Sequence, residues 1–208
     1  MKKVLAFFGA FNPPTNAHVN LAELAMKETG RERVIFVPSK SEYIVDEQKK
    51  EYSFDDGFRL DMLNDLAKAR PWMDICRYDL ESKTQPRTYE TLCYLRGQGD
   101  DAALLIGSDV LERMEKEWKN VDKIAQEFGI VCLTRSSLQL PEAYADDPFL
   151  SPLLPHIIFV KAPEEYLTKS STAARRQYDQ AIRYWKGLCA LVPPEAAARL
   201  LKKFNDIL

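Results

Sequence analysis

Short, continuous apolar runs alternate with stretches of helical periodicity along most of this chain. Strands are predicted at residues 4–8, 33–38, 72–80, 102–107, 129–135 and 156–162. Helices are predicted at residues 19–28, 58–69 and 88–98, where apolar side chains recur at helical spacing. Continuous apolar strands that alternate with helices indicate a parallel sheet covered on both faces. We therefore expect an α/β fold with a Rossmann-like, doubly wound parallel sheet and a small helical C-terminal cap.

The length of 208 residues fits a single domain. Residues 1–168 are expected to form its α/β core, and residues 169–208 its helical C-terminal part. Two stretches interrupt the pattern of strands and helices. Residues 39–57 are polar and charged, which predicts a long loop, and residues 141–155 contain four prolines, which predicts an irregular segment.

Composition excludes several classes of function. Lys plus Arg number 29 and Asp plus Glu 31, a balance that argues against a nucleic-acid polymer as partner. No apolar run is long enough for a membrane span or a secretion signal, so we expect a soluble, cytoplasmic protein without a membrane partner. The four cysteines are scattered among apolar residues without a C-x-x-C pair, which predicts buried, reduced thiols rather than a metal site.

The turn after the first predicted strand, residues 9–18, carries groups suited to an anion. It matches neither a dinucleotide fingerprint nor a phosphate-binding P-loop. Gly9 allows close backbone approach, and Thr15 and His18 would share one face of a helical turn. A helix N-terminus with an imidazole suits a phosphate. The alternative, in which His18 merely starts a helix and binds no ligand, is left open by these residues.

Two further turns are candidates for ligand contacts. Ser171 or Thr172 would cap the helix that follows, but the flanking cations, with Arg175 one turn later, are unfavourable at a helix N-terminus unless an anion is bound. This combination favours an anion site. The third turn, from Gly107 to Asp109, ends the most apolar strand, and Asp109 could hold sugar hydroxyls or cap the next helix.

The ordered set of motifs resembles a known family. "GAFNPPTNAH", "TYETL", "IGSD", a tryptophan shortly after it, "LTR" and "SSTAARR" are similar in order and spacing to nicotinate/nicotinamide mononucleotide adenylyltransferases. These enzymes belong to the nucleotidyltransferase superfamily with the (H/T)-x-x-H signature. The resemblance runs from Val4 to about Arg176, and "VPPEAAARLL" is similar to the family's C-terminal segment. It implies an enzyme of NAD biosynthesis that joins ATP to nicotinate or nicotinamide mononucleotide and releases pyrophosphate.

The resemblance also implies roles for individual residues. Thr15 and His18 are implied as catalytic residues at the ATP phosphates. ATP binding is implied for Gly9, Phe11, Gly107, Asp109, Ser171, Thr172 and Arg175. Mononucleotide binding is implied for Lys40, Thr88, Tyr89, Trp118 and Arg135, with Trp118 stacking on the pyridine ring and Thr88 and Tyr89 acting largely through the backbone. Mg²⁺ would be held mainly by ATP phosphates and water, without protein ligands, and a homo-oligomer is left open.

Some positions depart from the family pattern. Thr15, Asn12 and Ala17 stand where many bacterial members have His, Asp and Gly, and the Thr-Asn-x-His form is similar to eukaryotic members, so the preferred pyridine base stays open. Lys169 replaces the usual isoleucine. Two other functions are kept as alternatives: a nucleotidyltransferase with another acceptor, such as phosphopantetheine, and a catalytically inactive nucleotide-binding protein.

Overall fold

The computed structural model describes residues 1–50, 52–134, 141–163 and 188–205. Six strands form one sheet in the order β3-β2-β1-β4-β5-β6. Their bounds are β1 Lys2–Gly9, β2 Arg33–Pro38, β3 Met73–Ile75, β4 Asp100–Gly107, β5 Ile130–Thr134 and β6 Ile157–Lys161. This strand order is that of a doubly wound α/β sheet, which confirms the predicted fold class.

Helices lie between the strands in the chain, and one, α11, follows the last strand. They are α1 Asn16–Glu28, α2 Ser41–Asp46, α3 Asp56–Lys68, α4 Tyr78–Glu81, α5 Thr88–Gly97, α6 Ser108–Leu111, α7 Met114–Glu117, α8 Val121–Phe128 and α11 Pro194–Asn205. Two short 3-10 helices, Pro141–Tyr144 and Ser151–His156, occupy most of the stretch predicted to be irregular. Residues 39–57, predicted as a loop, contain the short helix α2, which is too brief to show helical periodicity.

The strand predicted over residues 72–80 was wrong in its second half. The strand ends at Ile75, and α4 follows at once. Asp79 is buried and accepts a hydrogen bond from Gln85 Nε2 at 2.5 Å, which anchors this helical turn. The alternating apolar residues of this stretch imitated a strand because one turn of helix is too short to reveal its period.

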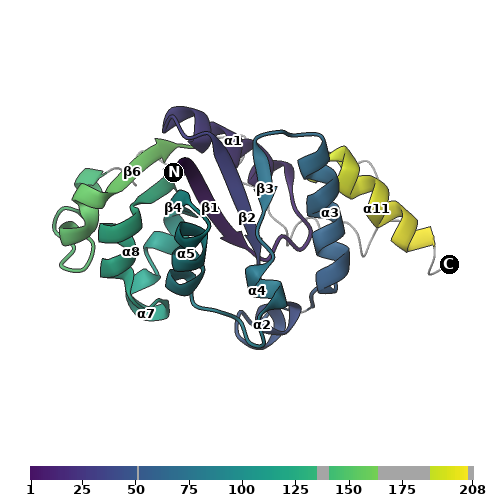
Figure 1. Cartoon of the computed structure of the whole chain (residues 1–208), viewed down its shortest axis with the longest axis horizontal. Helices are drawn as coiled ribbons and strands as arrows, with labels where there is room; N and C mark the ends of the chain where they lie inside the picture. Colours follow the sequence, from purple (N-terminus) through teal and green to yellow (C-terminus); the bar gives the residue numbers. More distant parts are fainter. Residues whose placement is uncertain (51, 135–140, 164–187, 206–208) are drawn as a thin grey trace. The chain divides into compact units, whose positions relative to one another are not determined.

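The described residues form two compact units, and the first comprises Met1–Phe8, Leu21–Ile35 and Pro86–Leu167. Its strands β1, β4, β5 and β6 are consecutive parallel neighbours, with Val4 opposite Ala102 and Leu104 opposite Ile130. Helices α5 and α8 pack against β4 (Figure 1). The buried side chains of α8 follow helical spacing: Val121, Ile124, Ala125 and Phe128.

The second unit comprises Gly9–Asn20 and Phe36–Gln85 together with the described residues 188–205. Helices α3 and α11 lie side by side in it (Figure 1). Between them lies an apolar cluster of Phe54, Met62, Leu188, Val192, Ala196, Ala197 and Leu200. Arg199 on α11 also pairs with Asp61 and Asp65 on α3. The helical C-terminal segment is therefore fixed by both apolar packing and ion pairs.

The cysteines only partly match the expectation of buried thiols. Cys76 and Cys132 are buried, Cys93 is half-buried, and Cys189 is exposed. Burial raises the pKa of the Cys132 thiol to about 12, so this thiol is unreactive. The expectation was wrong for Cys189, which lies near the surface although its sequence neighbours are apolar. In the described ranges, no helix combines the length and apolar character needed to cross a bilayer.

Candidate functional site

The strand order reverses between β1 and β4, which are parallel neighbours. In open α/β sheets, the turns that follow the carboxyl ends of the strands carry ligand contacts. β1 ends at Gly9 and β4 ends at Gly107, the two glycines that open predicted site motifs. The turn after β1 belongs to the second unit and the turn after β4 to the first.

Thr15 and His18 cap the start of α1 reciprocally. The Thr15 hydroxyl accepts the His18 backbone N–H at 3.3 Å, and the His18 Nδ1 accepts the Thr15 backbone N–H at 3.0 Å. This is the arrangement of a capping box, with histidine in the place usually taken by Glu or Gln. The three-residue spacing of the signature therefore fixes the imidazole against the first turn of the helix.

These hydrogen bonds also define the tautomer of the His18 ring. A ring nitrogen that accepts a backbone N–H has no proton of its own, so Nδ1 is unprotonated and the proton lies on Nε2. The Thr15 hydroxyl lies 2.9 Å from the same Nδ1. The ring is therefore oriented with Nδ1 towards Thr15, which leaves Nε2 as the nitrogen that can donate. Thr15 is 0% exposed, so in this structure its hydroxyl serves the imidazole rather than the surface.

Phe11 shapes the turn before the signature. Its φ is +42°, an uncommon conformation for a side chain of this size, and its buried ring packs edge-on against the His18 ring at 5.3 Å. A Cβ on Gly9 would lie 3.0 Å from the Phe11 ring, which explains why glycine stands there. The Phe11 side chain lies in the core, so any ATP contact at this position falls to the backbone.

Asn12 ties the same turn to a distant segment of the second unit. Its side chain is fully buried, its Nδ2 donates to the Tyr52 carbonyl at 2.9 Å, and its Oδ1 accepts the Phe54 backbone N–H at 2.9 Å. Both halves of the amide are used, which is possible for asparagine and impossible for an ionised aspartate. The departure from the family pattern at this position thus has a local physical reason.

Arg59 on α3 belongs to the same assembly, and sequence reasoning missed it. It is 0% exposed, and one of its hydrogen bonds ends on the carbonyl of Ala10 in the turn after β1. A signal was present in the sequence: Arg59 shares the apolar face of its helix with Met62, Leu63 and Leu66. A charged residue at such a position requires buried partners.

The turn after β4 brings Gly107 and Asp109 together. A Cβ on Gly107 would lie 2.6 Å from Asp109 Oδ1, so the carboxylate folds back over the glycine. The Asp109 side chain is 51% exposed, and its backbone carbonyl accepts from Arg113 Nε at 2.9 Å. An exposed carboxylate beside a bare Cα is suited to accept hydrogen bonds from sugar hydroxyls.

The predicted mononucleotide residues occupy varied surroundings. Thr88 begins α5, and the Tyr89 hydroxyl donates to Glu127 Oε1 on α8 at 2.9 Å, so the phenol is engaged within the first unit. Trp118 is half-buried where α7 ends. In the second unit, Lys40 Nζ donates to the Leu80 carbonyl at 2.8 Å, which directs this ammonium towards α4. Arg135, Ser171, Thr172 and Arg175 lie outside the described residues, as does Lys169.

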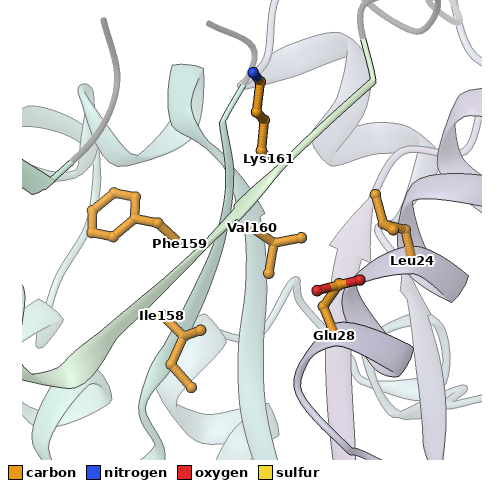
Figure 2. A pocket seen from close by; sticks show the side chains of 6 residues that line it. All are labelled: Leu24, Glu28, Ile158, Phe159, Val160 and Lys161. Atoms are coloured by element: carbon orange, nitrogen blue, oxygen red, sulfur yellow. The ribbon is translucent and has the colours of Figure 1, made fainter. Parts of the chain in front are cut away.

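A hollow of about 300 Å³ lies in the first unit and is separate from these motifs. Val160 on β6 faces Leu24 and Glu28 of α1, whereas Phe159 points to the other side of the strand (Figure 2). Ile158 and Lys161 complete the lining. None of the predicted site residues that the structure describes lines this hollow, so it is not taken as the candidate active site.

Similar proteins share one enzymatic name. A Clostridium tetani protein named "Probable nicotinate-nucleotide adenylyltransferase" is 26% identical, with 99% of this chain and 98% of that protein covered. The nicotinate-nucleotide adenylyltransferase of Bacillus subtilis is 25% identical, with 86% of each chain covered. A solved structure of Plasmodium falciparum nicotinic acid mononucleotide adenylyltransferase complexed with NaAD has a TM-score of 0.74 at 16% identity, covering 98% of this chain and 96% of that chain. That structure supports the fold.

A family model places the chain more directly. The model described as cytidylyltransferase-like matches residues 6–177, most of the chain. The matched range contains the strand-to-helix turns at Gly9 and Gly107 and the capped histidine at the start of α1. The chain therefore belongs to the cytidylyltransferase-like family.

Proposed function

We propose that this chain is an adenylyltransferase that joins ATP to nicotinate mononucleotide, or to its nicotinamide form, and releases pyrophosphate in NAD biosynthesis. The names of the relatives support the substrate pair. The observation that carries the proposal is the Thr15 backbone N–H on His18 Nδ1, because it leaves the imidazole as a fixed Nε2–H donor at a helix N-terminus. A residue that only started a helix would not need an imidazole in this place.

The reaction suits this arrangement. The 5′-phosphate of the mononucleotide attacks the α-phosphorus of ATP, a new P–O bond forms, the bond between the α-phosphorus and the bridging oxygen breaks, and pyrophosphate leaves. A phosphate monoester is ionised at neutral pH, so the attack requires no general base. Catalysis then consists of positioning and of stabilising negative charge on the phosphates. In this proposal the His18 Nε2–H donates to the α-phosphate or to the leaving pyrophosphate.

Thr15 has a changed role in this proposal. The resemblance implies a direct contact with ATP phosphates, but the Thr15 hydroxyl is buried and lies 2.9 Å from His18 Nδ1. We assign it to holding the imidazole, so that Thr15 acts through His18. The side chain of His18 then supplies the phosphate contact for the pair.

The remaining contacts are proposed from the resemblance and from local geometry. Asp109, folded over Gly107, would accept the ribose hydroxyls of ATP. Trp118 would stack on the pyridine ring, and Lys40 would contact the mononucleotide. Ser171, Thr172 and Arg175 would hold the β- and γ-phosphates, and Arg135 would lie near the mononucleotide. Mg²⁺ would arrive bound to the ATP phosphates, whose oxygens are ligands that it prefers.

Pyrophosphate release from ATP tests the proposal. Nicotinate mononucleotide, nicotinamide mononucleotide and phosphopantetheine are offered in turn as acceptors, and His18→Ala serves as the control. Turnover with a pyridine mononucleotide that falls about 100-fold in His18→Ala is expected, the scale of losing one transition-state donor. Turnover with phosphopantetheine alone would refute the proposal in favour of another acceptor, and no turnover with any acceptor would favour a nucleotide-binding role.

A further inference from the structure

A buried guanidinium joins three segments of the second unit. Arg59 Nη1 donates to the Ala10 carbonyl at 2.5 Å, Nη2 donates to the Ser39 carbonyl, and Nε donates to the Phe54 carbonyl at 3.1 Å. Ala10 follows β1, Ser39 follows β2, and Phe54 precedes α3. The Arg59 side chain therefore fixes the distance from the turn after β1 to the turn after β2 and to the segment before α3.

The charge of Arg59 is balanced mainly by the carboxylate of Asp56, to which that of Asp55 adds. Asp56 Oδ1 lies 2.7 Å from Arg59 Nη2 and also accepts from the Ser41 hydroxyl at 2.6 Å. Burial lowers the pKa of Arg59, and Asp56 counteracts this effect. Partial burial works to raise the pKa of Asp56, but hydrogen bonds from Ser41 and Arg59 outweigh it and lower the pKa.

Stability alone does not account for a charged residue here. Buried ion pairs are often replaced by apolar residues of similar volume without loss of stability. An apolar residue could fill the space of Arg59, but it could not direct three carbonyl groups at once. The fork of guanidinium donors supplies geometry rather than additional burial.

The turn that Arg59 holds is one that needs external support. Ala10 directly precedes Phe11, whose φ of +42° is unfavourable for a bulky side chain. Ser39 reinforces the tie, because its backbone N–H donates to the Gly9 carbonyl at 3.0 Å. From this turn the chain runs through Asn12 to Thr15, whose backbone N–H fixes the His18 ring.

We propose that Arg59 is a positioning residue for the phosphate-binding histidine. It fixes the carbonyls of Ala10 and Ser39, so the chain enters α1 in the orientation that places His18. Its role in turnover rests on the proposed function, whereas its role in orienting the imidazole does not. A displacement of about 1 Å at a catalytic group can cost about 100-fold in rate, so a defect here is measurable.

The test compares Arg59→Lys with Arg70→Lys. Arg70 follows the same helix and donates to the Leu66 carbonyl and to Glu195, each at 3.1 Å, so its replacement perturbs α3 without touching the turn after β1. The first readout is kcat and KM for ATP and mononucleotide. The second is the ¹⁵N spectrum of the His18 ring in the ligand-free protein. The chain has two histidines, so His156→Gln assigns the signals.

We expect Arg59→Lys to lower kcat at least about tenfold with both KM values within about threefold, and to shift the His18 ring signals away from the pure Nε2–H form. Arg70→Lys should leave both readouts as in the unchanged protein. If both variants behave alike, the positioning role is refuted. If the wild-type protein shows no turnover on pyridine mononucleotides, the proposed function is refuted. The ¹⁵N spectrum of the His18 ring would then still decide whether Arg59 orients the imidazole.

Arg59→Met provides a second variant with an unbranched, smaller side chain and no hydrogen-bond donors. The Asp56 carboxylate keeps its hydrogen bond from Ser41 and its side chain is 37% exposed, so it is not left fully buried without a partner. We therefore expect the variant to fold with reduced stability and to show the same loss of kcat and the same altered ring spectrum. Wild-type ring signals in a folded Arg59→Met protein would overturn the proposal. Failure of both Arg59 variants to fold would also overturn it, because the arginine would then be required for the fold itself.

Discussion

Replacing Asn12 by Asp tests whether the turn after β1 is held by the buried amide. The change keeps the oxygen that accepts the Phe54 N–H, but it places a second oxygen 2.9 Å from the Tyr52 carbonyl. The new carboxyl has two options in the folded state. It can stay ionised against a carbonyl in a buried site, or it can take up a proton and donate its O–H to Tyr52.

The cost of the protonated state follows from linkage. Protonating a carboxyl with an unfolded pKa of about 3.9 costs about 1.4 kcal/mol per pH unit above that value, which is about 5 kcal/mol near pH 7.5 and about 2 kcal/mol near pH 5.5. The ionised state carries at least the cost of an unsatisfied buried carbonyl, about 1–3 kcal/mol, and the penalty of a buried charge. We therefore expect a loss of about 2–5 kcal/mol near neutral pH.

The sign of the pH dependence is specific. Burial and the facing carbonyl raise the pKa of the new carboxyl in the folded state, so the folded state binds more protons than the unfolded state. The free energy of unfolding of the variant is therefore greatest below about pH 4, where the new carboxyl is protonated, and it falls as the pH rises through the raised pKa of that carboxyl. The deficit relative to the unchanged protein should therefore shrink as the pH falls from about 8 to about 5.5.

Urea denaturation of both proteins across this pH range measures the effect. Asn16→Asp is the matched control, because the Asn16 side chain is more exposed and donates to the Ala190 carbonyl at 3.2 Å. It should cost less than about 1 kcal/mol at every pH. A deficit below about 0.5 kcal/mol for Asn12→Asp, or one independent of pH, would refute the reasoning about this amide.

Three further predictions concern the signature, the turn after β4 and the C-terminal helix. His18→Gln, whose amide N–H can reach the position of Nε2, should retain at least about tenfold more turnover than His18→Asn; equal kcat values would contradict the Nε2–H donor. Gly107→Ala should displace the Asp109 carboxylate and raise the KM for ATP about tenfold with little change in Tm, because Asp109 is exposed; an unchanged KM would remove Asp109 from ATP binding. Hydrogen bonds from Arg199 and then Lys68 lower the pKa of Asp65 to about 2. Their contribution to the free energy of unfolding is therefore present above the unfolded pKa of 3.8 and is lost as the pH falls towards 2. Arg199→Ala should therefore cost up to about 1 kcal/mol at pH 7 for this solvent-accessible pair, and urea denaturation that showed the same cost at about pH 2.5 would contradict the assignment.

The sheet could be predicted from the sequence because its main strands are buried on both faces. Residues 34–37 and 102–106 are continuous apolar runs that are buried throughout. Each is too short for a typical helix and is followed by a turn residue, Pro38 or Gly107. The short helices α2 and α4 could not be predicted in the same way. Each is held by side-chain contacts from elsewhere, such as Gln85 on Asp79, rather than by its own periodicity.

The motifs of the candidate site could be read from the sequence, whereas most of its local geometry could not. The spacing of Thr15 and His18 placed both on one face, but the reciprocal cap that fixes the ring tautomer needed the structure. The roles of Asn12 and Arg59 depend on partners about 40 and 49 residues away in the chain, which no local pattern encodes. Only the place of Arg59 on an apolar helix face offered a signal.

The fate of the phosphate oxygen atoms shows whether the mononucleotide attacks ATP directly. Nicotinate mononucleotide labelled with ¹⁸O in its phosphate is incubated with ATP and the protein, and the dinucleotide and pyrophosphate are separated and weighed by mass spectrometry. We expect the two products in equal amounts, with all of the label in the dinucleotide and none in pyrophosphate. Label in pyrophosphate, or pyrophosphate released without a dinucleotide, would contradict direct attack of the mononucleotide phosphate on the α-phosphorus of ATP.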